Sequence, residues 1–181
     1  MENETIDATV AFIDICGFTA ISETEKPNAV VTLLNRYFDV MVKEIIDQNG
    51  IIDKFIGDCV MAVFKGAYHL DRAIDASLAI RNKINELPQE FGFAPHVSIG
   101  INSGEMISGN IGSAALRRLD YTVIGDTVNT AQRLQATAGV NQIVITEACH
   151  EKVKLSFNCR NIGSVALKNK SGEIVLYEVI N

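Results

Sequence analysis

Two aspartates stand out because apolar residues surround each of them. Asp14 interrupts the apolar run near the end of residues 5–15, where an unpaired carboxylate is costly to bury. Asp58 follows Gly57 in a short turn, and turn chemistry alone also explains a lone aspartate there. As a pair, two hard oxygen ligands with no histidine beside them suit Mg²⁺ or Mn²⁺ better than Zn²⁺. Two such ions would serve an in-line phosphoryl displacement.

The segment after Asp14 has the composition of a phosphate cradle. It reads Ile15-Cys16-Gly17-Phe18-Thr19. A glycine turn that follows a strand exposes successive backbone N–H groups, which can donate to phosphate oxygens. The alternative is that Gly17 only makes a turn.

Asn129 and Arg133 form a second polar pair much later in the chain. A helix is expected there, and a spacing of four positions puts both side chains on one helix face. The planar guanidinium of arginine suits a phosphate that gains negative charge in a transition state. The alternative is an ordinary helix face turned to solvent.

Alternating strands and helices must position these residues. The pattern predicts a strand, a helix, two strands joined by a tight Gly-Asp turn, a second helix and a further strand. These elements cover residues 5–15, the stretch from Pro27 to Asn49-Gly50, 51–56, 59–64, 69–87 and 96–111, the last of them broken by Gly100, Gly104 and Gly109. This order is the ferredoxin-like βαββαβ core of an α+β domain, an antiparallel-rich sheet with helices packed on one face.

The rest of the chain adds further strands and a short helix to this core. A short strand leads through Gly125-Asp126 into a third helix that ends near Gly139. The strands are expected at residues 121–124, 142–145, 157–162 and 174–180, and the short helix at 147–153.

Length and composition indicate one globular domain over residues 1–181. Hydrophobic residues make up 48% and charged residues 21% of the chain, which is enough for a full core. The formal charge of −6 argues against nucleic acid as a partner. No apolar run is long enough to span a bilayer, and the first residues lack the blocks of a signal peptide. We therefore expect a cytoplasmic domain that makes no membrane contact.

The cysteines and histidines offer no nucleophile or metal centre. The cysteines lack metal-ligand spacing, so we expect small buried hydrophobes in a reducing compartment rather than disulfides; they are Cys16, Cys59, Cys149 and Cys159. No nucleophile–histidine pairing stands out among His69, His96 and His150, which are expected at the surface or as satisfied core residues.

Taken together, three segments resemble the class III adenylate and guanylate cyclases. They are FIDICGFT at 12–19, DKFIGD at 53–58 and DYTVIGDTVNTAQR at 120–133. The resemblance runs from Ala8 to about Glu178 in the order and spacing of the family. It implies a lyase that converts a nucleoside triphosphate into a cyclic nucleotide and pyrophosphate.

The resemblance assigns the metal and phosphate roles residue by residue. Asp14 and Asp58 match the two metal-binding aspartates, and Ile15 matches the residue whose backbone carbonyl binds one of two Mg²⁺ or Mn²⁺ ions per site. Phe18 and Thr19 fall in the phosphate loop. Lys168 looks like the triphosphate lysine, although Lys170 is close enough to exchange roles with it, and Asn169 stands where relatives often have glycine.

The resemblance also assigns the residues that hold the ribose and the base. Asn129 and Arg133 match the pair that orients the ribose and stabilises the α-phosphate, and Lys54 and Thr122 match the pair that reads adenine. Adenine presents a ring acceptor beside an amino donor, and guanine a carbonyl acceptor; relatives that act on GTP typically have Glu in place of Lys54. The sequence thus favours an adenylate cyclase acting on ATP. The alternatives are a guanylate cyclase and an inactive nucleotide-binding or dimerisation module.

The resemblance further implies a head-to-tail homodimer with two shared active sites. In the family, the metal aspartates of each site belong to one subunit and the base and ribose residues to the other. Residues 110–119 match the arm that reaches across the dimer. Regulatory domains are expected outside this chain.

Overall fold

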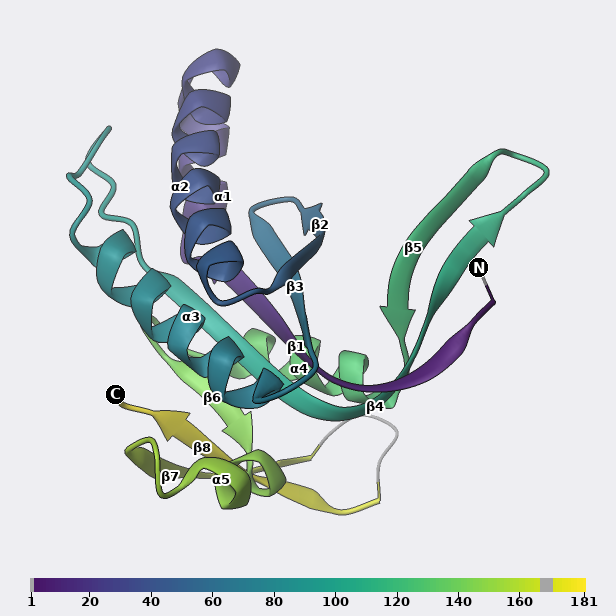
Figure 1. The fold of residues 1–181 in the computed structure, drawn as a ribbon. Coiled ribbons are helices and arrows are strands. Elements are labelled where there is room, and N and C mark those ends of the chain that lie inside the picture. The colour runs from purple at the N-terminus through teal and green to yellow at the C-terminus, as the bar shows by residue number, and fades with distance from the viewer. Residues whose placement is uncertain (1, 167–170) are drawn as a thin grey trace.

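The computed structural model describes residues 2–166 and 171–181. These residues form one eight-stranded sheet with the order β2-β3-β1-β4-β6-β8-β7, and β5 pairs with β4 off this path (Figure 1). The strands are β1 (Glu4–Ile15), β2 (Ile51–Ile56), β3 (Cys59–Lys65), β4 (Val97–Ser113), β5 (Arg118–Ile124), β6 (Ile143–Thr146), β7 (Cys159–Ala166) and β8 (Glu173–Val179). The helices are α1 (Phe18–Thr24), α2 (Pro27–Asp47), α3 (His69–Asn85), α4 (Asp126–Thr137) and α5 (Glu147–Val153).

The first four strands and the helices α2 and α3 confirm the ferredoxin-like prediction. The order β2-β3-β1-β4 is antiparallel at every pairing. Odd-numbered residues of β1, from Ala11 to Ile15, are buried with the apolar faces of α2 and α3 in one core. The two-residue period of a strand sends its other residues to the opposite face.

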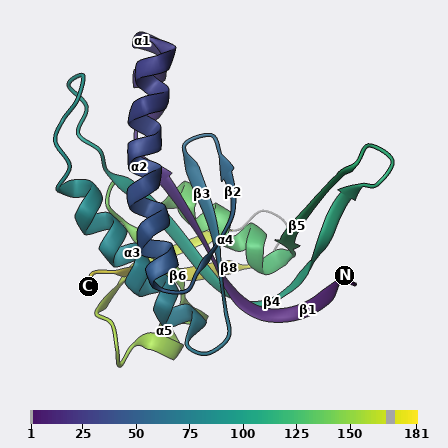
Figure 2. The ribbon, with the colours of Figure 1, turned by 45° about the horizontal axis from the view of Figure 1, so that its top comes forward.

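The expectation that helices pack on one face holds for this core but not for α4. Val128 and Ala131 of α4 pack with Val10 and Phe12 of β1, on the face opposite α2 and α3. Gly100 of β4 makes this approach possible, because a Cβ atom there would lie 2.2 Å from the backbone nitrogen of Gln135 in α4. Figure 2 shows α4 behind the sheet and α2 in front of it.

The predicted break of residues 96–111 at their glycines was wrong. β4 runs without interruption from Val97 to Ser113 and pairs with β5, which begins at Arg118 rather than at 121. At Gly112 the backbone of β5 comes so close that a Cβ atom would lie 2.0 Å from the Arg118 carbonyl oxygen. Gly112 therefore allows β4 to pair with β5 instead of ending the strand. The outer part of this hairpin extends away from the body of the molecule (Figure 1).

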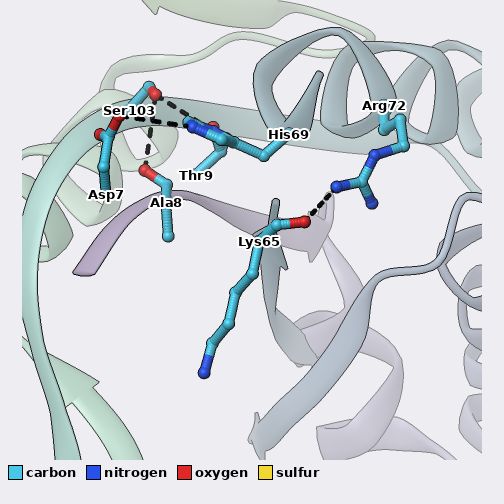
Figure 3. Close-up of polar contacts among 7 residues, drawn as sticks. All are labelled: Asp7, Ala8, Thr9, Lys65, His69, Arg72 and Ser103. Atoms are coloured by element: carbon cyan, nitrogen blue, oxygen red, sulfur yellow. Dashed lines mark hydrogen bonds and ion pairs between the residues drawn. The ribbon is translucent and has the colours of Figure 1, made fainter. Parts of the chain in front are cut away.

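Polar contacts fasten the start of α3 to the sheet. The His69 ring lies 2.6 Å from the Thr9 hydroxyl through Nδ1 and 3.7 Å from Asp7 Oδ2 through Nε2. Arg72 donates to the backbone carbonyl of Lys65 at the end of β3 (Figure 3). These contacts agree with the prediction that His69 is a satisfied structural residue.

Two further predictions concern the state of the cysteines and the lack of a membrane-spanning segment. All four cysteines are free, and burial raises the pKa of each thiol, that of Cys59 to about 12. Cys149 is buried, whereas Cys16, Cys59 and Cys159 are half-buried. The expectation of free thiols is therefore confirmed, and that of full burial holds for Cys149. None of the helices within residues 2–166 and 171–181 combines the length and apolar composition needed to cross a bilayer.

Candidate active site

The Asp14 and Asp58 carboxylates lie side by side where β1 ends, next to the turn between β2 and β3. Asp14 pairs with Cys59 in the β1–β3 register, so the turn residue Asp58 is its immediate neighbour. The Ile15 N–H donates to the Asp58 carbonyl oxygen over 3.4 Å, which ties the turn to the end of β1. The proximity expected from the two strands is therefore present.

This pair has the charge and donor chemistry of a divalent-cation site. Burial raises the pKa of Asp14 to about 7, and the charge of Asp58 and a hydrogen bond with it contribute further. A cation between the carboxylates would offset this repulsion. Within the described residues, no cluster of three His, Cys, Asp or Glu side chains is placed to hold an ion. The donors fit Mg²⁺ or Mn²⁺, which retain water and substrate phosphate as further ligands.

Phe18 and Thr19, which the resemblance places in the phosphate loop, are the first two residues of helix α1. Gly17 takes a left-handed conformation with φ of 71°, and α1 begins at Phe18. The Phe18 ring is buried edge-on against Tyr37 and Phe93, so only its backbone can face a phosphate. Thr19 is exposed and lines, together with Asp58, a cavity of about 300 Å³.

Lys54 and Thr122 lie together at a second cavity, as their assignment to one base requires. This cavity has a volume of about 330 Å³. Its wall comes from β1, β2, β3, β4, β5 and α4, and includes Phe12 and Gln132. It shares no lining residue with the cavity beside Asp58. Within one protomer, Asp58 and the two residues assigned to the base therefore open on separate cavities.

Sequence reasoning missed Asp53, which contacts both of the residues that the resemblance assigns to the base. The Thr122 hydroxyl donates to Asp53 Oδ2 over 2.7 Å, and the Lys54 ammonium lies 3.6 Å from the same oxygen. The Asp53 side chain is only 6% exposed. Its place directly before Lys54 in DKFIGD was the available signal, but regular strand alternation predicts opposite faces for neighbouring residues.

Asn129 and Arg133 are on α4, as the spacing predicted. Asn129 is exposed and Arg133 half-buried, while Val128, Ala131 and Leu134 form the buried side of the helix. Their roles toward ribose and phosphate remain predictions. The predicted triphosphate lysine, Lys168, and its alternative, Lys170, lie outside the described residues.

The sheet and the carboxylate pair are those expected of a nucleotidyl cyclase domain. The family described as the adenylate and guanylate cyclase catalytic domain matches residues 1–181. The chain therefore belongs to this family, the class III nucleotidyl cyclases.

Individual relatives agree with this assignment. An adenylate cyclase from Anabaena cylindrica is 36% identical over 94% of this chain. The crystal structure of the adenylyl cyclase CyaB from P. aeruginosa matches with a TM-score of 0.89 and 31% identity, over 100% of this chain and 97% of that one. The catalytic core of a rhodopsin-guanylyl cyclase with converted specificity, in complex with ATPαS, matches with a TM-score of 0.90 and 27% identity, over 99% and 98% of the two chains.

The curated relatives are much longer than this chain. The chain aligns with 36% of the Anabaena cylindrica enzyme and with 23% of a Mycobacterium bovis relative. The structural relatives include both adenylyl and guanylyl cyclases, so the fold defines the cyclase class and leaves the base to be argued from the site.

Proposed function

We propose that this domain is an adenylate cyclase, which converts ATP into 3′,5′-cyclic AMP and pyrophosphate. The observation that carries the proposal is that Lys54 and Thr122 line one cavity. An ammonium donor beside a hydroxyl that can accept a hydrogen bond complements the N1 acceptor and N6 amino group of adenine. Guanine, which presents the carbonyl O6 and an N1–H group, would place a donor against the Lys54 ammonium.

The reaction would be an attack of the ribose 3′-oxygen on the α-phosphorus. The carboxylates of Asp14 and Asp58, with the Ile15 carbonyl, would hold two Mg²⁺ or Mn²⁺ ions. Bound there, the ions would favour ionisation of the 3′-hydroxyl and neutralise phosphate charge. Asn129 would orient the ribose, and the Arg133 guanidinium would donate to the α-phosphate oxygens as negative charge develops.

The triphosphate would extend away from this centre. Phe18 and Thr19 would contribute backbone groups beside the phosphates, and Lys168 would provide a positive charge. No protein nucleophile takes part in this scheme, because the sugar hydroxyl attacks directly and pyrophosphate is the leaving group.

We further propose a head-to-tail homodimer with two shared active sites. The separate cavities support this arrangement, because one protomer then supplies the carboxylate pair and its partner supplies the base cavity. The protruding β4–β5 hairpin, which includes the predicted arm at 110–119, would reach a second copy. Regulatory segments would lie outside this chain.

A mixing experiment tests the shared site. Asp14→Ala and Asn129→Ala are each expected to be inactive alone, and their mixture should regain activity because a heterodimer contains one intact site. If the mixture stays inactive although both variants dimerise, the shared site is excluded.

A substrate comparison tests the reaction. Cyclic nucleotide and pyrophosphate would be measured with ATP and with GTP, in Mg²⁺ and in Mn²⁺, over a range of protein concentration. The proposal expects cyclic AMP from ATP, with specific activity that rises with protein concentration. A preference for GTP would indicate a guanylate cyclase, and no pyrophosphate with either nucleotide would indicate an inactive binding module.

A further inference from the structure

We propose that Asp53 determines the choice of ATP over GTP without touching the base, by fixing the hydroxyl of Thr122 as a hydrogen-bond acceptor. The inference rests on the proposed adenylate cyclase function and adds a positioning residue to its base site. The Asp53 carboxylate is nearly buried and contacts both residues assigned to the base.

A β-bulge brings Asp53 to this position. In the pairing of β2 with β3, Ile52 faces Ala62 and the next paired residue, Lys54, faces Met61. Asp53 is therefore an extra residue without a partner in the register. Such a bulge re-aims a side chain and is often found next to active sites. Here the Lys54 ammonium and the Asp53 carboxylate come within 3.6 Å, although the residues are consecutive.

Thr122 lies between the base cavity and the Asp53 side chain. It lines the base cavity together with Lys54, and it also lines a smaller cavity of about 50 Å³ together with Asp53. Asp53 is absent from the lining of the base cavity. The carboxylate thus lies behind Thr122 as seen from the base cavity, and it would act on a base there only through its neighbours.

The direction of the hydrogen bond decides what Thr122 offers to a base. A hydroxyl carries one proton and two acceptor lone pairs, whereas an ionised carboxylate can only accept. Because the Thr122 proton is donated to Asp53 over 2.7 Å, only its lone pairs remain for the cavity. They match the N6 amino donor of adenine and oppose the O6 acceptor of guanine.

The Asp53 carboxylate needs both of its neighbours because it is nearly buried. The Asp53 side chain is 6% exposed, and a nearly buried charge is costly unless it is paired and hydrogen-bonded. The Lys54 ammonium supplies the opposite charge and the Thr122 hydroxyl supplies the hydrogen bond. Without Asp53, the Thr122 proton would be free to turn toward the cavity and donate to guanine O6.

The test is a double-mutant cycle with Asp53→Ala and Thr122→Val, read as the ratio of kcat/KM for ATP to that for GTP. The ratio should fall about tenfold in Asp53→Ala, mainly through a gain of GTP use, which corresponds to one hydrogen bond of ordinary strength. In the Thr122→Val background, the further loss of Asp53 should change the ratio less than about threefold, because the hydroxyl it orients is gone.

Controls separate this role from a structural one. Asp47→Ala removes an exposed aspartate that pairs with Lys43 on α2 and should leave the ratio unchanged. If Asp53→Ala does not fold, Asp53→Asn, which keeps the size but can also donate, replaces it in the cycle with a smaller fall expected. An equal loss of ATP and GTP turnover, or an equal fall in both Thr122 backgrounds, would overturn the inference. A wild-type protein that prefers GTP would instead refute the proposed function.

Discussion

The carboxylate pair and the base cavity are assembled in different ways. Asp14 lies on β1 and Asp58 in the turn directly before β3, and the register of β1 with β3 brings the two together. The base cavity instead needs β2, β5 and α4 at once, and its key contact joins Asp53 to Thr122 across 69 positions of sequence. The carboxylate pair thus depends on a single strand pairing, whereas the base cavity depends on how several elements pack together.

The two regions also differ in how their charges are balanced. The Asp14 carboxylate faces a like charge, which helps to raise its pKa to about 7. The Asp53 carboxylate faces the Lys54 ammonium and the Thr122 hydroxyl. The carboxylate pair therefore has the charge to take up a cation, whereas the Asp53 carboxylate is already paired with Lys54. Changes in the two regions should accordingly have different consequences.

The largest effect is expected from Asp14→Ala. The loss of a carboxylate that would hold the metal ions should reduce cyclic AMP formation about a thousandfold or more, because metal stabilisation of the reacting phosphate is worth several kcal/mol. Asp39→Ala, at an exposed position on α2, is the matched control. Retention of more than a tenth of the wild-type rate would contradict the role of Asp14.

A second change addresses the base cavity and leaves the carboxylate pair intact. Lys54→Glu should lower the preference for ATP over GTP about 10- to 100-fold, since a misplaced donor or acceptor costs about 1–3 kcal/mol against a base edge. The dependence of the rate on Mn²⁺ concentration should stay as in the wild type. Lys26→Glu, at an exposed position, is the control, and an unchanged nucleotide preference in Lys54→Glu would refute the base assignment.

Gly100→Ala tests the dependence on packing. A Cβ atom at Gly100 would meet the backbone of α4 at 2.2 and 2.5 Å, so the variant should lose about 1–3 kcal/mol of stability. Thermal unfolding measures this loss. Gly139→Ala, whose Cβ would meet only the end of the Gln142 side chain, at 3.2 Å and beyond, should change the midpoint far less. Equal thermal unfolding midpoints for the two variants would mean that α4 does not pack closely against β4 at Gly100.

The smallest effect concerns the like charges of the carboxylate pair. Without divalent ions at pH 8, Asp58→Asn should raise the thermal midpoint by about 2 °C, because it removes the charge beside Asp14. Mn²⁺ should raise the midpoint of the wild type more than that of the variant. The cation site is refuted if Mn²⁺ stabilises both proteins equally.

Most elements of the fold could be predicted from local pattern. The β1 strand, α2, the β2–β3 hairpin and α3 appear within a few residues of their predicted bounds, because periodicity and turn residues act over short distances. The Asp14 and Asp58 pair could be predicted from the fold class, because β1 and β3 are neighbours in a ferredoxin-like sheet and Asp58 lies directly before β3.

The cyclase family, the ferredoxin-like core and a few of the residues at the two cavities, namely Asp58, Lys54 and Thr122, followed from the sequence alone. The folded arrangement was needed to show that α4 covers the opposite face, that β4 continues through its glycines, and that Asp53 lies behind Thr122. The physical reason is that these features depend on register and close backbone approach between elements far apart in the chain. A strand pattern records which residues alternate, but a bulge that re-aims Asp53 is visible only when the partner strand is in place.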